Sequence, residues 1–197
     1  MMTVKQKWEQ RQERILLSLD KLTYATRKQL QAINELGGDR NAHRILHRME
    51  REKTIQSVRM EQKVYYLSNK GKERIGSNQG DLKRNHIEHT LMRNDLYIRL
   101  GMPSGWQKER PVTWGDDSKM VPDAMFNKGG VFHFVEIDNK QSMRNNIEKI
   151  KMYKELSEMI FKQYKHYPTL IWYTLSEVRR NKLKETCKKH GVKCKVY

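Results

Sequence analysis

The sequence predicts a mixed α/β protein with two domains in series. Apolar residues recur at helical spacing through the first 51 residues, and two short strand-like runs follow. The small polar stretch Gly76-Ser-Asn-Gln-Gly80 then interrupts the pattern. After this stretch, strand-like apolar runs and helical patterns alternate toward the C-terminus. We therefore expect one domain at 1–76, a linker at 77–84 and a second domain at 85–197.

The composition limits the class of protein. The chain has 197 residues, of which 37% are hydrophobic and 32% are charged, which is enough for one medium domain or two small ones. No run approaches the ~20 apolar residues of a membrane span, so no membrane association is expected. The only cysteines, Cys187 and Cys194, lie in a lysine-rich segment and are expected to be free thiols in a reducing cytoplasm.

The net charge of +17 indicates a polyanionic partner. Residues 1–80 carry 17 basic side chains against nine acidic ones, and residues 81–197 carry 23 against 14. Because both halves are basic, the charge does not come from one tail. Double-stranded DNA is the simplest partner that fits this distribution.

Three helices are expected at the start of the chain. The first runs from Lys5 to about Tyr24 on the spacing of its apolar residues. In the second, Thr26 and Gln29 have the spacing of a capping box, and Gly37-Gly38 is expected to end the helix. The third begins at Asp39, which we expect to be its N-cap, and runs to Arg51.

The third helix has two unlike faces. Its apolar residues fall at i, i+3, i+4 and i+7, and they are Ala42, Ile45, Leu46 and Met49. The opposite face is basic, which suits the major groove, because Arg pairs with guanine, Asn with adenine, and other cations hold phosphates. A solvated charged face is the alternative. The expected DNA-binding residues of this domain are Arg27, Lys28, Arg40, Asn41, Arg44, His47, Arg48, Arg51, Arg59 and Lys63.

Two strands, 54–59 and 63–67, and a short helix at 68–75 complete the first domain. The order of three helices and a hairpin, with the ending Tyr66-Leu-Ser-Asn-Lys-Gly-Lys, resembles winged helix-turn-helix domains over residues 5–76. That resemblance implies that helix 39–51 reads DNA and that the hairpin, near Arg59 and Lys63, contacts adjacent phosphates. Winged helices often bind palindromic sites as dimers, so a homodimer is one expected form.

The second domain is expected to alternate helices and strands. A helix at 86–100 is followed by a strand from Trp106 to Trp114, with Pro111 at an edge or bulge. Strands at 121–126 and 131–137 flank the turn Asn127-Lys-Gly-Gly130. Then come a helix to about residue 164, a buried strand at 169–175, a basic helix at 177–190 and a short strand at 192–197.

Acidic side chains gather at one end of the strand pair. Asp123 lies on the first of these strands, and Glu136, Asp138 and Lys140 are two residues apart, so they share one face if the strand continues. Burying such charges costs free energy unless they bind a metal ion or one another. Ordinary ion pairs with Lys140, Lys149 or Arg144 are the alternative.

The element order and these residues resemble the PD-(D/E)XK nuclease fold. In that superfamily two acids on adjacent strands hold a divalent cation, Mg²⁺ or Mn²⁺, which activates a water, and a nearby lysine helps to orient that water. The resemblance implies metal ligation by Asp123, Glu136 and Asp138. The second motif has two readings. Asp138-Asn-Lys140 fits the acid-x-lysine pattern, whereas Glu136 fits better by its distance along the strand and then has Asp138 in the lysine's place. The residues implied for catalysis are Glu88, Asp123, Glu136, Asp138, Lys140 and Lys149, the last as a substitute lysine from the next helix.

The wider arrangement is similar to the replication-relaxation family of plasmid and phage proteins of Gram-positive bacteria. The motifs that carry this likeness after the winged helix are His89-Thr-Leu, Asn94-Asp95, Val121-Pro-Asp, Val135-Glu-Ile-Asp138, Lys149 and Tyr153. The resemblance implies a role in replication, relaxation or transcription control of a mobile element. Three uses of the second domain stay open: metal-dependent cleavage or nicking of DNA, DNA binding or dimerisation without cleavage, and plain structural ion pairing.

Overall fold

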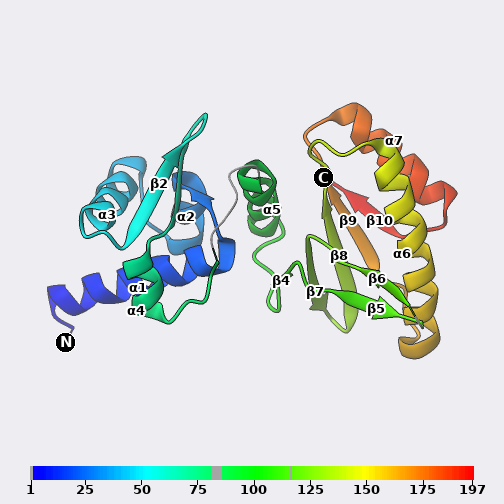
Figure 1. Cartoon of the computed structure of the whole chain (residues 1–197), viewed down its shortest axis with the longest axis horizontal. Helices are drawn as coiled ribbons and strands as arrows, with labels where there is room; N and C mark the ends of the chain where they lie inside the picture. Colours follow the sequence, from blue (N-terminus) through cyan, green and yellow to red (C-terminus); the bar gives the residue numbers. More distant parts are fainter. Residues whose placement is uncertain (1, 81–85, 116) are drawn as a thin grey trace. The chain divides into compact units, whose positions relative to one another are not determined.

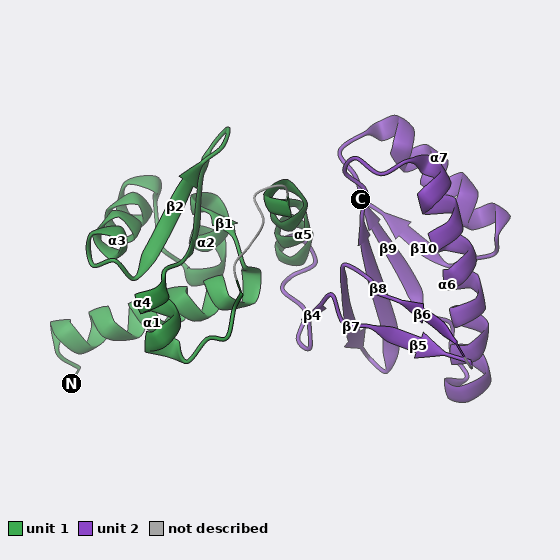
Figure 2. Ribbon diagram, viewed as in Figure 1, with its two compact units in different colours: residues 1–98 green, residues 99–197 purple. Residues whose placement is uncertain are grey.

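A computed structural model describes residues 2–80, 86–115 and 117–197 and divides the chain into two compact units (Figure 2). Unit 1 is Met1–Ile98 and unit 2 is Arg99–Tyr197. The described residues form seven helices and three sheets, so the mixed α/β class is confirmed (Figure 1). Within them, every helix is too short or too polar to span a lipid bilayer.

Unit 1 contains all the elements expected for the first domain and two more, the short strand β1 and helix α5. Its small sheet has the strand order β1-β3-β2, and both pairings are antiparallel. The hairpin prediction is confirmed, with Arg59 opposite Lys63 at its tip. The elements are α1 (Val4–Leu22), β1 (Ala25–Thr26), α2 (Arg27–Asn34), α3 (Asp39–Arg51), β2 (Ile55–Arg59), β3 (Lys63–Leu67), α4 (Asn69–Ile75) and α5 (Ile87–Arg99).

Local signals fix the starts of the helices in unit 1. Thr26 caps α2, and the side chain of Gln29 accepts a hydrogen bond from the Thr26 backbone, so the capping box is confirmed. The helix ends earlier than expected, at Asn34, with Glu35 in the left-handed conformation. The N-cap of α3 is Gly38, and Asp39 is the first helical residue. The expectation for Asp39 was therefore wrong, because its carboxylate is held by Arg27.

Gly71 shows how closely α4 packs on the start of the hairpin. A Cβ atom at this position would lie 2.0 Å from the carbonyl oxygen of Thr54. Ser68 caps α4 through the backbone N–H of Gly71, and its hydroxyl donates to the carbonyl of Lys53. Only glycine permits this approach of two backbones, so the motif Ser-Asn-Lys-Gly determines where the hairpin meets the helix.

The boundary between the units differs from the expected one. Helix α5 was expected to open the second domain, but it packs in unit 1 up to Ile98. The amide of Asn94 donates to the carbonyls of Leu22 and Tyr24 at 3.2 and 2.6 Å, and Ile87 is buried against Tyr24 and Val64. The contacts of α5 with Leu22 and Tyr24 cross more than 60 residues of sequence, so composition could not reveal them. Residues 81–84 of the expected linker lie outside the described residues.

Unit 2 is built on a five-stranded mixed sheet of order β10-β9-β8-β7-β4. Strands β8, β9 and β10 are parallel, whereas β7 is antiparallel to both β8 and β4. A separate hairpin pairs β5 with β6. The elements are β4 (Gln107–Lys108), β5 (Val112–Trp114), β6 (Ser118–Met120), β7 (Ala124–Lys128), β8 (Val131–Ile137), α6 (Met143–Tyr164), β9 (Thr169–Tyr173), α7 (Glu177–Lys189) and β10 (Cys194–Val196).

The predicted strand from Trp106 to Trp114 was wrong. The structure has two short strands there, β4 on the main sheet and β5 in the separate hairpin. Between them Glu109 adopts a positive φ of 48°, and Pro111 has no N–H to donate to a ladder. The chain therefore changes sheets within four residues. Strand β6, the partner of β5, was not foreseen.

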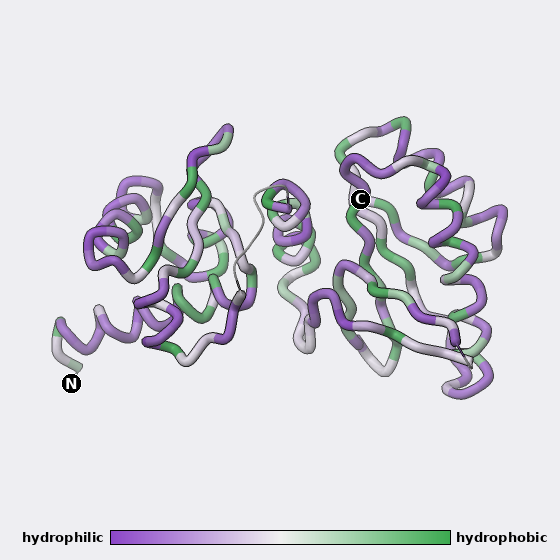
Figure 3. Tube along the Cα trace, in the orientation of Figure 1, coloured by the Kyte–Doolittle hydropathy of each residue, from purple (hydrophilic) through white to green (hydrophobic). Residues whose placement is uncertain are grey.

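The core of unit 2 lies between the sheet and helices α6 and α7. It combines Phe134, Leu170 and Trp172 from the sheet with Ile150, Tyr153 and Leu156 of α6 and with Leu183 of α7. The turn between β7 and β8 is made by Gly129 and Gly130, both at positive φ, as predicted. Hydrophilic residues dominate α3 in unit 1 and α7 in unit 2 (Figure 3).

Candidate functional site

Helix α3 presents a basic face to solvent because its opposite, apolar face is buried in the core of unit 1. Its four apolar residues are all buried, as the periodicity predicted. The side chains opposite them are exposed. In the described part of the chain, no ion pair forms with Arg40 or Arg51. His47 stacks on His43 with ring centroids 6.1 Å apart. The exposed basic side chains are Arg40, His43, Arg44, His47, Arg48 and Arg51.

Asn41 holds the turn before α3 rather than extending freely into solvent. Its amide nitrogen donates to the carbonyl of Leu36 at 2.8 Å, and its amide oxygen accepts from the guanidinium of Arg44 at 2.8 Å. The side chain of Arg44 as a whole is exposed. Asn41 therefore fixes the direction of Arg44, a positioning role that the sequence did not suggest.

Arg48 and Arg27 are held by neighbours at the flanks of this face. The Nε of Arg48 donates to Glu52 at 2.8 Å, and its guanidinium lies 3.9 Å from the centre of the Trp8 ring. Arg27 forms a two-point ion pair with Asp39, with N–O distances of 2.6 and 2.9 Å. This hydrogen bond holds the pKa of Asp39 below its usual value. The Arg27 pair joins α2 to α3 and so orients the two helices.

The hairpin contributes one exposed and one paired cation. Arg59, at the end of β2, is exposed. Lys63 donates to Glu50 of α3 at 2.8 Å, and Ser57 donates to the other oxygen of the same carboxylate. Lys28, the remaining predicted contact on α2, is also exposed. Glu50 therefore ties the hairpin to α3, which leaves Arg59 as the cation at the hairpin tip that is open to a ligand.

In unit 2 the structure brings Glu136 together with two side chains of α6. The ammonium of Lys149 donates to one carboxylate oxygen at 2.5 Å, and the hydroxyl of Tyr153 donates to the other at 2.8 Å. Glu136 has no exposed surface. Burial, and then the charge of Asp123, raise the pKa of Glu136 to about 7, against the opposing effects of Lys149 and Tyr153. The lysine partner is thus Lys149, the residue predicted from the next helix.

Asp138 lies beyond the end of β8 and has a different set of partners. Arg179, at the start of α7, donates to its two oxygens at 2.6 and 2.5 Å, and Asn146 of α6 adds a third bond at 2.8 Å. The strand ends at Ile137, so the expected single face of residues 136, 138 and 140 does not continue. Arg179 was not predicted, because nothing local links it to a residue 41 positions away.

Asp123 lies next to Glu136 through the backbone of β8. The N–H of Ile137 donates to its carboxylate at 2.6 Å, directly before β7 begins. Lys140 is exposed beyond β8, and Glu88 lies on α5 in the other unit. Of the six residues implied for catalysis, the structure therefore groups Asp123, Glu136 and Lys149 and places Asp138 in a neighbouring pair.

The carboxylates as arranged do not fit a divalent cation. A bound Mg²⁺ or Mn²⁺ needs carboxylate oxygens that are free to ligate it. Both oxygens of Glu136 and both oxygens of Asp138 already accept hydrogen bonds, most of them from cations. Among the described residues, no three acidic, histidine or cysteine side chains form a metal-binding group. The geometry favours the ion-pair alternative, and the metal site remains a prediction.

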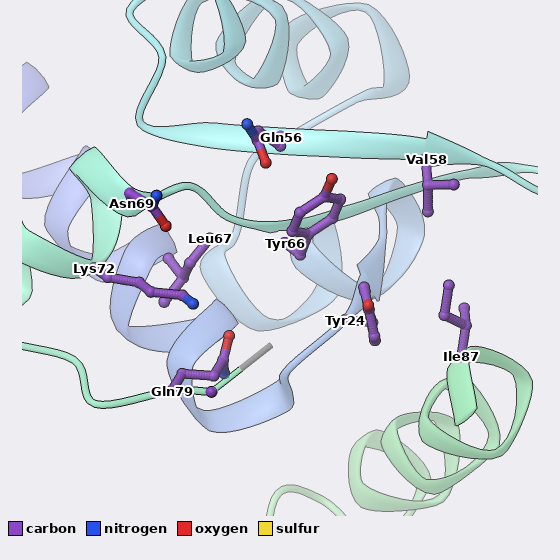
Figure 4. Close-up of a pocket in the computed structure, with 10 residues that line it drawn as sticks. Tyr24, Gln56, Val58, Tyr66, Leu67, Asn69, Lys72, Gln79 and Ile87 are labelled. Atoms are coloured by element: carbon purple, nitrogen blue, oxygen red, sulfur yellow. The ribbon is translucent and has the colours of Figure 1, made fainter. Parts of the chain in front are cut away.

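Unit 1 contains a hollow of about 300 Å³ (Figure 4). Its walls come from the hairpin, α4 and the segments around Tyr24 and Gln79, and Tyr66 and Ile87 line it from β3 and α5. It contains none of the predicted DNA-binding or catalytic residues. The basic face of α3 and the acidic cluster therefore remain the candidate sites.

Comparison with solved structures finds a distant likeness to Can2 from Sulfobacillus thermosulfidooxidans, solved in complex with cyclic tetra-adenylate. The identity is 10% and the TM-score 0.34, and the match covers 96% of this chain but 48% of that one. The chain thus spans about half the length of that protein. Among curated proteins the comparison gives no match.

The family comparison covers most of both units. The model of the replication-relaxation family matches residues 16–170, which include α2, α3, the hairpin, the acidic cluster and α6. This is the family that the sequence motifs had indicated. The protein belongs to the replication-relaxation family.

Proposed function

We propose that this protein binds double-stranded DNA of a plasmid, phage or other mobile element and acts in its replication, relaxation or transcription control. Family membership supports the replication context. The net charge of +17 supports a polyanionic partner, because phosphate neutralisation supplies most of the affinity of such proteins for DNA.

In this proposal unit 1 is a winged helix-turn-helix domain. Helix α2, a short turn and α3 are followed by the β2–β3 hairpin, which is the order such a domain requires. Helix α3 would enter the major groove, and the hairpin, with Arg59 at its tip, would follow the adjacent phosphates. The observation that carries the proposal is the basic face of α3, which stays exposed because the opposite face is fully buried.

Arg44 is the best base-reading residue on this face. Its guanidinium is oriented by Asn41 and still exposes nitrogens that match the O6 and N7 acceptors of guanine. Arg40 and Arg51 have no ion pair among the described residues, so they are available for phosphates. Arg48, stacked on Trp8, would contribute at the flank.

Unit 2 is proposed to have a nuclease-like PD-(D/E)XK architecture used for DNA binding or for dimerisation. The mixed sheet with parallel β8, β9 and β10, crossed by α6 and α7, supports that architecture. The ion pairs of Glu136 and Asp138 support a use without cleavage.

The test begins with selection of preferred duplexes from a random library and measures affinities by gel shift. Arg44→Ala is expected to weaken binding to the selected duplex by about 1–3 kcal/mol and to relax preference at one base step. Lys63→Ala should weaken all duplexes alike and by less, because its ammonium is already paired with Glu50.

Lys7→Ala is the matched control, because Lys7 is an exposed cation on α1 outside the proposed interface. It removes the same charge as Arg44→Ala and should leave the base preference unchanged. If Arg44→Ala and Lys7→Ala behave alike on selected and random duplexes, α3 is not the reading helix.

A further inference from the structure

The end of α6 and the loop after it expose an unusual set of rings in unit 2. Phe161, Tyr164 and Tyr167 are 40%, 51% and 48% exposed. Every other Phe, Tyr and Trp of the described residues is buried or half-buried. Exposed aromatic rings that cluster in seven residues of sequence mark an interaction site more often than rings scattered singly. We call Phe161, Tyr164 and Tyr167, with Lys162 and Lys165, the aromatic end of unit 2.

The rings at the aromatic end are held in place by their neighbours. Phe161 and Tyr167 stack with centroids 4.5 Å apart and planes 11° from parallel. Tyr164 meets Phe132 of β8 edge-on at 5.4 Å, and Phe132 also contacts His166 at 5.6 Å. Because these contacts already order the rings, a planar ligand that stacks on an open ring face costs little side-chain entropy.

The charge around the rings is positive. Residues 159–168 include Lys162 and Lys165, both exposed, and no acidic residue. Glu158, one turn earlier on α6, is paired with Lys154 at 3.1 Å. Strands β8 and β9 are parallel, so the turn with Lys128 and the loop before β9 share one end of the sheet. Lys193 joins them there, because its carbonyl accepts from the N–H of Leu170. The acidic cluster lies toward the other end, at and just after the last residues of β8.

Aromatic rings that alternate with lysines match the chemistry of a single nucleic-acid strand better than that of a duplex. A single DNA strand alternates anionic phosphates with unpaired bases, and each base has a π-face that stacks on an aromatic ring whatever its sequence. A duplex hides those faces within its own stack. We infer that the aromatic end of unit 2 binds single-stranded DNA, with bases stacked on Tyr164 and on the Phe161–Tyr167 pair. This site is additional to the duplex interface proposed for α3.

The test is fluorescence anisotropy of a fluorescein-labelled oligo(dT) strand titrated with the full chain. Tyr164→Ala is expected to weaken binding by about fivefold or more, the usual effect of removing one stacking ring. Tyr164→Trp should bind oligo(dT) about as tightly as the unchanged protein, because tryptophan also offers an aromatic ring for stacking although it lacks the tyrosine hydroxyl. Val178→Ala is the matched control, since Val178 is 65% exposed and lies on α7 after the opposite end of the sheet.

A strand of the same length without bases separates stacking from charge. Tyr164→Ala should bind this abasic strand as tightly as the unchanged protein does, whereas Lys162→Ala should weaken binding to both strands. Thermal melting of each variant checks that the fold is kept. If Tyr164→Ala lowers the affinity for oligo(dT) and for the abasic strand by the same factor, the stacking assignment is overturned.

The outcome is independent of the α3 proposal when each variant is measured on both kinds of DNA. Arg44→Ala should weaken binding to the selected duplex. The factor by which Tyr164→Ala weakens binding to oligo(dT) should be the same whether or not the protein also carries Arg44→Ala. If Tyr164→Ala binds oligo(dT) normally, the inference fails. A simultaneous loss of self-association in sedimentation would then identify the aromatic end as a contact between copies of the chain.

Discussion

The basic face of α3 and the acidic cluster of unit 2 differ in the exposure and the pairing of their charged side chains. Arg40 and Arg51 are in solvent and have no ion pair among the described residues, whereas Glu136 is fully buried and meets both Lys149 and Tyr153. An exposed cation keeps its hydration until a ligand displaces it, so it is ready to bind a phosphate. Removing a partner of a buried carboxylate destabilises the fold, because the buried charge is left uncompensated. Charged residues that look equally functional in sequence therefore differ in the structure, as exposed cations in one unit and a buried, paired carboxylate in the other.

The largest effect is expected when the buried pair is broken. Lys149→Ala leaves Glu136 without its cation and should lower the free energy of unfolding by about 3–5 kcal/mol. Urea denaturation followed by circular dichroism measures it. The cost should be smaller below pH 7, because Glu136, with a pKa of about 7, then becomes protonated.

Arg51→Ala provides the comparison from unit 1. Arg51 is exposed, so its removal should change the free energy of unfolding by no more than about 0.5 kcal/mol. Equal destabilisation by Lys149→Ala and Arg51→Ala would contradict the division between a binding surface and a structural ion pair.

A smaller effect is expected from pH acting on Glu136. Its pKa is raised from 4.5 to about 7 in the folded protein, so between these values the folded state binds more protons than the unfolded state. Stability contributed by this group is therefore present below pH 4.5 and declines as the pH rises to about 7. The raised pKa of Lys149 acts only at alkaline pH, above 10.5.

The measurement is the melting temperature across this pH range. Glu136→Gln should flatten the decline that the unchanged protein shows, whereas Glu155→Gln, at an exposed position of α6, should not. A decline that persists in full in Glu136→Gln would mean that another group causes it.

The smallest effect is expected in a cleavage assay. Supercoiled plasmid incubated with the protein and Mn²⁺ should remain supercoiled, because the oxygens of Glu136 and Asp138 are already engaged. Agarose electrophoresis would reveal open-circular or linear products. Cutting that Asp123→Ala and Glu136→Ala both abolish would instead establish the metal-dependent endonuclease alternative.

Much of the fold could be predicted because its signals are local. The capping box of Thr26 and Gln29, the i, i+3, i+4, i+7 pattern of α3 and the Gly129-Gly130 turn each involve residues within about one helical turn or hairpin. The hydrogen bonds and backbone angles that they need are set by neighbours in sequence. The predicted helices and the two main hairpins were therefore confirmed with small shifts at their ends.

The candidate sites also divide into features set by local sequence signals and features set by long-range packing. Sequence periodicity alone determined that the arginines of α3 would face solvent, because burial of Ala42, Ile45, Leu46 and Met49 fixes the rotation of the helix. Only the tertiary structure decided that α5 belongs to unit 1, that Arg179 pairs with Asp138, and that Lys149 rather than Lys140 reaches Glu136. Each of these outcomes depends on how elements far apart in the sequence pack together. The sequence offered Lys149 only as one of several candidates, because residue spacing does not determine that packing.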